Sequence, residues 1–226
     1  MTRIAVIIPD RRDRPRFLEQ CLKLLAAQTL QPVLVVLVDD EPLSNAVDIT
    51  WRYRIGYQRV SFSSRPVDLV AFIENDDWYH PNYLEYMAAQ WEAHGRPAML
   101  GLNHTVYYHI GVRKHFMLNH PTRSNAMNTF ILPGLPLRWP LDHDPYTDVW
   151  LWNYGLDNAN NKRRVVLTPA QEYCLGIKHG VGKCGGQNHS DNMERYVHDD
   201  EDGAWLRSII VGDGVDWYLA SSRTCQ

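Results

Sequence analysis

Carboxylates gather at two places in the first eighty residues, each directly after a run of apolar residues. The members are Asp39 and Asp40 in the first cluster and Glu74, Asn75, Asp76 and Asp77 in the second. Glu74, Asn75 and Asp76 of the second cluster offer oxygen ligands of the kind that hold Mg²⁺ or Mn²⁺, and such an ion bridges phosphate groups. A carboxylate of the first cluster suits hydrogen bonds from a base or a ribose. The alternative interpretation is that both clusters are turns and helix caps, where Asp and Asn are common.

A second set of side chains that bind metals lies in the Gly-rich stretch 174–190. Its members are spaced five residues apart and are Cys174, His179, Cys184 and His189. Regular Cys and His spacing is one sign of a zinc site, but structural zinc usually uses two cysteines separated by only two to four residues. A surface histidine without a ligand is the other interpretation. The spacing therefore argues against structural zinc and leaves single histidines as candidates.

Composition limits the class of protein. The chain has 226 residues, of which 45% are hydrophobic and 22% charged, which is typical of a folded globular domain. A net charge of −3 provides no general basic field for nucleic acid. The apolar runs are too short to span a bilayer, and the first residues lack the apolar core of a signal peptide. Four scattered cysteines make no disulfide framework. We expect a soluble, cytoplasmic protein.

The elements that must position the acidic clusters alternate between strands and helices. β-Branched apolar runs predict strands at residues 4–8, 33–38 and 69–73, and helical spacing predicts helices at 15–28 and 81–95. This order is typical of an open α/β sheet, in which the carboxyl ends of parallel strands share one edge. Both acidic clusters should therefore converge on a single crevice.

The second half of the chain has weaker patterns. They predict strands separated by turns at 98–118, an irregular Pro-rich stretch at 121–145, a short helix at 148–156, a strand at 165–167, a loop at 174–190 and a helix at 199–211. No internal repeat or clear domain boundary is present. We therefore expect a single domain spanning residues 1–226.

The two acidic segments resemble those of family-2-type glycosyltransferases with the GT-A fold. The likeness covers residues 3–92. It is strongest at 72–84, Phe-Ile-Glu-Asn-Asp-Asp-Trp-Tyr-His-Pro-Asn-Tyr-Leu, which is similar to a metal-binding segment where Asp-x-Asp precedes Asp, two aromatics, Pro and Tyr-Leu. The resemblance implies an α/β fold with a GT-A-type, Rossmann-like nucleotide-binding sheet flanked by helices, and an irregular C-terminal acceptor-side part. Residues 1–118 would form the nucleotide-sugar half and residues 119–226 the acceptor-side half.

Carried over by position, the resemblance assigns roles to individual residues. Those expected on the donor nucleotide are Pro9, Asp10, Arg14, Asp39, Asp40, Arg65, Asn75 and Lys178. The metal ligands would be Glu74, Asp76 and His179, with His189 as the alternative to His179. The sequence departs from the family pattern in three places: Glu replaces the first Asp of the triplet, Glu-Pro follows Asp39-Asp40 in place of Gly-Ser, and Ser64-Arg65-Pro66 stands where Ala-Arg-Asn is usual.

The family's general base is an acidic residue that enters a helix further along the chain. The best match is Asp148, within the stretch 146–152, with Asp142 and Asp144 as reserves. The alternative interpretation is that Asp148 only favours the start of a helix. The aromatic residues nearby are expected to line the acceptor site; they are Trp139, Tyr146, Trp150, Trp152 and Tyr154.

The resemblance therefore implies a metal-dependent, inverting glycosyltransferase that uses Mn²⁺ or Mg²⁺ and a nucleotide-diphosphate sugar, with a UDP-sugar as the first expectation. The acceptor would be a glycan, a lipid-linked sugar, a protein or a modified nucleic acid such as a hydroxymethylated base in phage DNA. A nucleotidyltransferase is one alternative, although residues 10–14 lack the glycines of a phosphate loop. A non-catalytic zinc or nucleic-acid-binding module is the other, and it would bind zinc without turnover.

Overall fold

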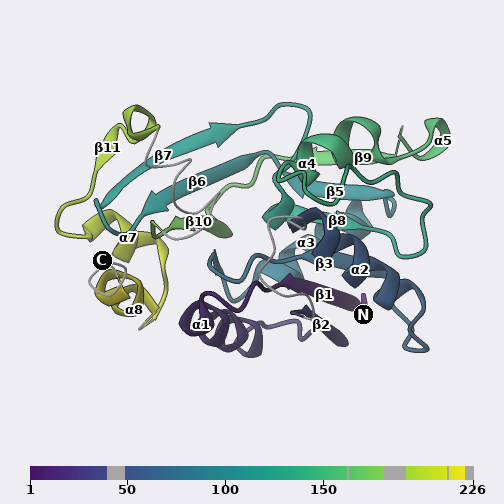
Figure 1. Cartoon of the computed structure of the whole chain (residues 1–226), viewed down its shortest axis with the longest axis horizontal. Helices are drawn as coiled ribbons and strands as arrows, with labels where there is room; N and C mark the ends of the chain where they lie inside the picture. Colours follow the sequence, from purple (N-terminus) through teal and green to yellow (C-terminus); the bar gives the residue numbers. More distant parts are fainter. Residues whose placement is uncertain (40–48, 162, 181–191, 213, 222–226) are drawn as a thin grey trace.

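The computed structural model describes residues 1–39, 49–161, 163–180, 192–212 and 214–221 (Figure 1). A six-stranded sheet forms its larger part. The strands, in spatial order, are β2 (Leu34–Val38), β1 (Ile4–Pro9), β3 (Leu69–Phe72), β8 (Thr129–Ile131), β5 (Met99–Leu102) and β9 (Arg164–Leu167). β1 is parallel to both β2 and β3, and β8 is antiparallel to its neighbours β3 and β5.

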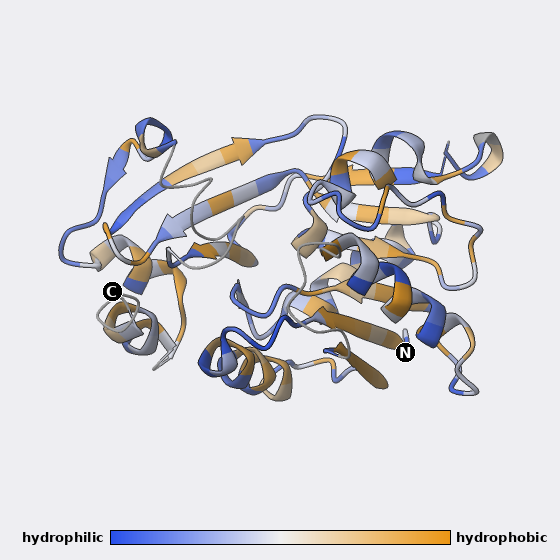
Figure 2. Cartoon of the chain, viewed as in Figure 1, coloured by the Kyte–Doolittle hydropathy of each residue, from blue (hydrophilic) through white to orange (hydrophobic). Residues whose placement is uncertain are grey.

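Helices cover both faces of this sheet. They are α1 (Pro15–Ala26), α2 (Ile49–Ser61) and α3 (Tyr83–Ala93). Ile4, Val6 and Ile8 of β1 share a hydrophobic core with α1 and α3, whereas Ala5 and Ile7 face α2. A strand that is buried on both faces needs a continuous apolar run, which is the pattern of β1 (Figure 2).

A second sheet extends away from the first, toward the C-terminal helices (Figure 1). Its strands, in spatial order, are β11 (His198–Asp199), β7 (Lys114–Asn119), β6 (His104–His109), β10 (Cys174–Lys178) and β4 (Trp78–Tyr79). Helices α7 (Ala204–Ile209) and α8 (Gly214–Ser221) pack on it, and Phe17 of α1 joins the same core. The start of α1 therefore lies where the two sheets meet.

The remaining elements are short. They are the 3₁₀ turns at Ala126–Asn128 and Met193–Arg195, α4 (Thr147–Trp150), the π-helical turn η2 (Leu151–Gly155) and α5 (Asn158–Asn161). Within the described residues, no helix has the length and apolar character that a membrane span requires.

The strong sequence patterns predict the first hundred residues well: β1, β2, β3, α1 and α3 are confirmed within a few residues, whereas α2 was not predicted. In the second half, β8 lies in the stretch predicted to be irregular, and β10 lies in the predicted loop. The predicted helix at 199–211 is shorter, because α7 begins only at Ala204, after β11. Both sheets also combine strands from either side of residue 118.

Gly176 explains why β10 does not have the sequence of an ordinary strand. A Cβ atom at this position would lie 2.5 Å from Cδ1 of Tyr107 on the neighbouring strand β6. Glycine in a strand marks this kind of close approach. The Tyr107 ring therefore lies where a side chain of β10 would otherwise stand.

We expect Gly176→Ala to lower the free energy of unfolding by about 1–3 kcal/mol, the usual cost of overpacking, because the Tyr107 ring must shift. Gly214→Ala in α8 is the matched control, since its Cβ would meet Ile210 at an ordinary 3.4 Å. Denaturant unfolding of both variants tests the expectation. Equal stability of Gly176→Ala and wild type would contradict the close contact.

Candidate active site

The carboxyl ends of β1 and β3 bring two predicted residues together. Asp10 follows β1, and its Oδ1 accepts a hydrogen bond of 2.7 Å from Nδ2 of Asn75, which follows β3. Arg52 of α2 donates from Nε to the backbone oxygen of Asp10 at 3.0 Å. These contacts hold the loop after β1 against the acidic segment. Arg52 was not predicted, because its helix carried no recognised signal.

Three carboxylates lie together at the end of β3. Glu74, Asp76 and Asp77 each offer an oxygen, and these oxygens lie within 4.8 Å of one another. Oδ1 of Asp77 accepts the backbone N–H of Ile177 at 2.8 Å, whereas its buried Oδ2 has no hydrogen-bond partner among the described residues. Such an oxygen, beside two further carboxylates, fits a divalent cation that prefers oxygen ligands. Sequence analysis identified the first two residues but assigned no role to Asp77.

Cationic and imidazole groups approach Asp76 from other elements. Its Oδ2 contacts Nη1 of Arg14, which precedes α1, and lies 2.9 Å from Nε2 of His179, which follows β10. The Arg14 and His179 nitrogens are themselves 3.1 Å apart. The structure thus unites Arg14, Asp76 and His179, which are far apart in the sequence. His189, the alternative to His179, lies outside the described residues.

Lys178 brings a second positive charge to the carboxylates. Only 4% of the residue is exposed, and its Nζ lies 4.9 Å from the centroid of the Tyr107 ring, a cation–π contact. Burial raises the pKa values of Glu74 and Asp77, and the Lys178 charge opposes that rise; the same charge adds to the lowering of the pKa of Asp76. Lys178 therefore lies close enough to this cluster to act on all three carboxylates.

Burial and neighbouring charges shift the pKa values of the three carboxyl groups in different directions. Burial raises the pKa of Glu74 to about 7, although Lys178 opposes the shift. Burial also raises the pKa of Asp77 well above its usual value. Burial would raise the pKa of Asp76 as well, but the Arg14 charge and the hydrogen bond with His179 outweigh it and hold that pKa far below the usual range. Negative charge is therefore concentrated on Asp76.

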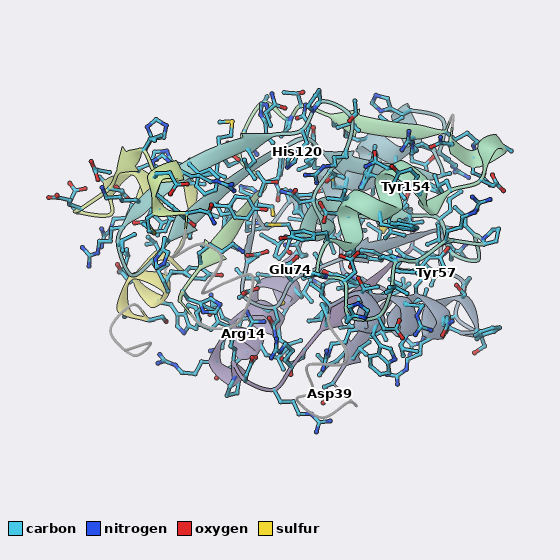
Figure 3. All side chains as sticks on the ribbon, turned by 45° about the horizontal axis from the view of Figure 1, so that its top comes forward. Arg14, Asp39, Tyr57, Glu74, His120 and Tyr154 are labelled. Atoms are coloured by element: carbon cyan, nitrogen blue, oxygen red, sulfur yellow. The ribbon has the colours of Figure 1, made fainter. Side chains whose placement is uncertain are left out.

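Two further predicted residues lie at the same edge of the sheet. Pro9 ends β1, and the partly exposed Asp39 follows β2, with its carboxylate 3.7 Å from Nε of Arg12. Figure 3 shows Asp39 and Arg14 on one side of Glu74 and His120 on the other. Asp40 lies outside the described residues.

Arg65 lies elsewhere and corrects one prediction. Its Nη1 donates to the backbone oxygen of Val33 at 2.7 Å, and Val33 immediately precedes β2. Arg65 is therefore at the amino-terminal edge of the sheet, opposite to Asp39 and Asp76. The structure does not bring it to the expected nucleotide side, because its short segment connects α2 to the beginning of β3 rather than to its end.

Asp148 reaches the site from the second half of the chain. It lies in the first turn of α4, and its Oδ2 pairs with Nη1 of Arg123. Burial raises the pKa of Asp148, while the Arg123 charge opposes the shift. The negative charge of Asp148 also contributes to the raised pKa of Glu74. The charge of the candidate base therefore acts on the acidic segment.

The reserve carboxylates have structural contacts. Arg54 donates to both oxygens of Asp142, at 2.9 and 2.8 Å from Nη2, and Oδ1 of Asp144 accepts the backbone N–H of Tyr146 at 2.8 Å. The aromatic residues that were expected to line the acceptor site are partly buried and partly exposed. Trp152 is buried and Trp139 packs against the core of the first sheet, whereas the exposed members are Tyr146, Trp150 and Tyr154.

Comparison with known proteins finds a likeness to solved structures only. No family model and no curated protein matches the sequence. The 1–349 segment of S. aureus TarS in complex with UDP-GlcNAc matches with a TM-score of 0.57 and 15% identity over 99% of this chain and 72% of that chain. The same segment in complex with UDP matches with a TM-score of 0.52 and 14% identity, over 99% of this chain and 88% of that chain. A further crystal structure of S. aureus TarS matches with a TM-score of 0.51 and 14% identity, over 100% of this chain and 53% of that chain.

This likeness, at such low identity, concerns the fold. It confirms the predicted α/β fold class, in which a mixed sheet is flanked by helices. Within this fold, the acidic segment at the end of β3 lies at the carboxyl edge of the parallel strands, where ligands of open α/β sheets bind.

The buried carboxyl group of Asp77 leads to a stability prediction. In metal-free buffer at neutral pH, we expect Asp77→Asn to raise the free energy of unfolding by about 1–2 kcal/mol, because asparagine carries no group whose ionisation is disfavoured by burial. Asparagine keeps an oxygen for the Ile177 N–H. Because the folded-state pKa of Asp77 is raised, the wild type loses stability as pH rises above about 4, and the advantage of the variant should grow over that range.

Denaturant unfolding between pH 4 and 8 measures this difference. Asp77→Ala is the control, since it also removes the acceptor for the Ile177 N–H and should lower stability. A difference in the free energy of unfolding between Asp77→Asn and wild type that stays the same at every pH would contradict a raised pKa of the buried Asp77 carboxyl group.

Proposed function

We propose that this protein is a glycosyltransferase that uses a divalent cation and a nucleotide-diphosphate sugar, a UDP-sugar, and that it transfers the sugar with inversion to a hydroxyl acceptor. The observation that carries the proposal is the convergence of Asp76, Arg14, His179 and Lys178 at the carboxyl edge of β1 and β3, opposite Asp148. The complexes of TarS with UDP-GlcNAc and UDP support a donor of this class on this fold.

The residues at the end of β3 fit a divalent cation. Glu74, Asp76 and Asp77 supply clustered oxygens, one of them without a hydrogen-bond partner among the described residues, and His179 supplies a nitrogen beside Asp76. Carboxylate oxygens suit Mn²⁺ or Mg²⁺. When bound, the ion neutralises negative charge that develops on the leaving diphosphate.

The protein's own charges serve the same purpose. Breaking the sugar–phosphate bond leaves an extra negative charge on the nucleoside diphosphate, and fixed cations in a buried site stabilise that charge strongly. Arg14 and Lys178 are the two cations beside the acidic segment, and both are largely shielded from water. We assign to Asp39, which follows β2, the role of accepting hydrogen bonds from the base.

Asp148 is the proposed general base. A hydroxyl acceptor must lose its proton as it attacks the sugar, and a carboxylate within hydrogen-bond reach can take that proton. Only 15% of the Asp148 side chain is exposed, so the carboxylate is shielded from water without being closed off. A single base on the acceptor side of the sugar is the arrangement that direct inversion requires.

We propose a glycan, a lipid-linked sugar, a protein or a modified nucleic acid as the acceptor. The exposed aromatics Tyr146, Trp150 and Tyr154 surround α4 and offer flat apolar surfaces to any of these. The zinc-module alternative is weakened, because Cys174 is buried in the core of the first sheet and burial raises the pKa of its thiol well above the usual value. Cys184 and His189 lie outside the described residues.

The metal assignment has a direct test. Asp76→Asn should weaken Mn²⁺-dependent UDP binding by about 10–100-fold or more, because it removes the ionised carboxylate of the cluster. Calorimetric titration of UDP with and without Mn²⁺ measures this effect. Asp13→Asn, which changes a carboxylate 3.2 Å from Nε of Arg14, is the control and should keep the response to Mn²⁺. An unchanged response in Asp76→Asn would rule out the assignment.

The base assignment needs a different readout. Asp148→Asn should lower the transfer rate by about 10²–10⁴-fold and leave UDP affinity nearly unchanged, because the base acts only on the acceptor proton. Asp144→Asn, which keeps an oxygen for the Tyr146 N–H, is the control and should transfer normally. If Asp148 only starts a helix, its replacement should cost about 1 kcal/mol or less in stability and leave turnover near normal.

A further inference from the structure

Arg123 is the residue that contacts the proposed base most directly. Its Nη1 pairs with Oδ2 of Asp148, and the two side chains are only 20% and 15% exposed. Arg123 lies in the turn after β7, in a stretch whose sequence showed no regular pattern. Partial burial makes this ion pair stronger than a surface pair, which is usually worth little. The contact therefore matters for the position and the charge of Asp148.

His120 holds the other side of the same guanidinium group. Nη2 of Arg123 lies 3.0 Å from Nε2 of His120. Arginine has only donors, so the hydrogen bond requires an unprotonated Nε2, and His120 is neutral with its proton on Nδ1. Burial and the Arg123 charge both lower the pKa of His120, in agreement with this state. One arginine thus connects a neutral imidazole to a carboxylate.

The two segments that carry this contact are tied together behind it. The hydroxyl of Thr129 donates to the backbone oxygen of Asn125 at 2.7 Å and accepts Nε1–H of Trp152 at 2.9 Å. Asn125 lies two residues after Arg123, and Trp152 lies one helical turn after Asp148. Both elements are therefore fixed to the same buried hydroxyl, so the ion pair has little freedom to rearrange.

The surroundings of Asp148 affect whether its carboxyl group is ionised. Burial raises the pKa of Asp148 and thereby favours its protonated form. A protonated carboxyl group cannot accept a proton from an acceptor hydroxyl. Arg123 is the positive charge in contact with Asp148 that opposes this tendency.

We propose that Arg123, held by neutral His120, is a positioning residue that keeps Asp148 ionised and fixes its carboxylate for proton removal from the acceptor. The inference rests on the proposed function, since it assumes that Asp148 acts as the base. Arg123 contacts Asp148 through one oxygen in the geometry described. The pair between Arg54 and Asp142 differs, because Arg54 engages both carboxylate oxygens and its partner is 40% exposed.

The test compares Arg123→Gln, Arg123→Lys, His120→Gln and His120→Ala, with Arg54→Gln as the matched control that breaks another arginine–aspartate pair. The carboxyl carbon of Asp148 is followed by NMR across pH in protein with ¹³C-labelled aspartate, in the presence of Mg²⁺ and UDP. Its signal is assigned as the one missing in Asp148→Asn. Transfer rate against pH, UDP affinity and thermal melting are measured on the same variants.

We expect Arg123→Gln to raise the titration midpoint of Asp148 by about 1–3 pH units, the usual effect of removing an adjacent arginine, and to shift the acid limb of the rate profile equally. Arg123→Lys keeps the positive charge and should therefore change the titration midpoint of Asp148 little. It should lower the transfer rate, because an ammonium group lacks the planar pair of nitrogens that contacts Asp148 and His120 together. His120→Gln keeps an acceptor for Arg123 and should transfer better than His120→Ala. UDP affinity should change in none of them.

An unchanged Asp148 midpoint in folded Arg123→Gln would overturn the inference, as would an equal shift in Arg54→Gln. Loss of UDP affinity in Arg123→Lys would also overturn it, by placing Arg123 on the donor. If the midpoint shifts but the wild type transfers no sugar, the proposed function fails while the electrostatic coupling between Arg123 and Asp148 stands. The NMR titration therefore separates the two failures.

Discussion

The burial of several carboxylates where the two sheets meet is the constraint on which this structure depends. Removing a charge from water costs several kcal/mol even after relaxation, and only close, opposite charges offset that cost. Arg14 arrives from the loop before α1 and Lys178 from the end of β10, so the charges of Asp76 and its neighbours fix how three separate elements meet. The site is therefore also part of what holds the two sheets together.

Tyr107 links the two sides of this arrangement. Its ring faces Nζ of Lys178, and its hydroxyl accepts Nδ2–H of Asn125 at 3.0 Å, close to the turn that carries Arg123. Gly176 on the adjacent strand leaves room for the ring. A single buried aromatic side chain thus lies between the acidic segment and the segment that holds the proposed base. Because Tyr107 belongs to β6, the packing of the second sheet sets the distance between these two segments.

Much of this site was predictable from sequence, for a physical reason. The apolar runs that form β1 and β3 predict buried parallel strands, and the carboxyl ends of such strands meet at one edge. Any polar residue directly after them, such as Asp10 or Asp76, must lie there. His179 was found through the family resemblance, although its strand β10 was predicted to be a loop, because Gly176 breaks the usual strand pattern.

The partners of these carboxylates were much harder to predict. Arg123 stands 25 residues before Asp148, in a turn without periodicity, and its contact depends on how β7 ends and α4 begins. Arg65 shows the opposite error, since a motif remnant placed it at the site while its chain position directs it to the other edge of the sheet. Strand ends follow from local pattern, whereas the cations that make buried carboxylates tolerable are set by long-range packing. The charge balance of such a site is consequently the part that requires a structure.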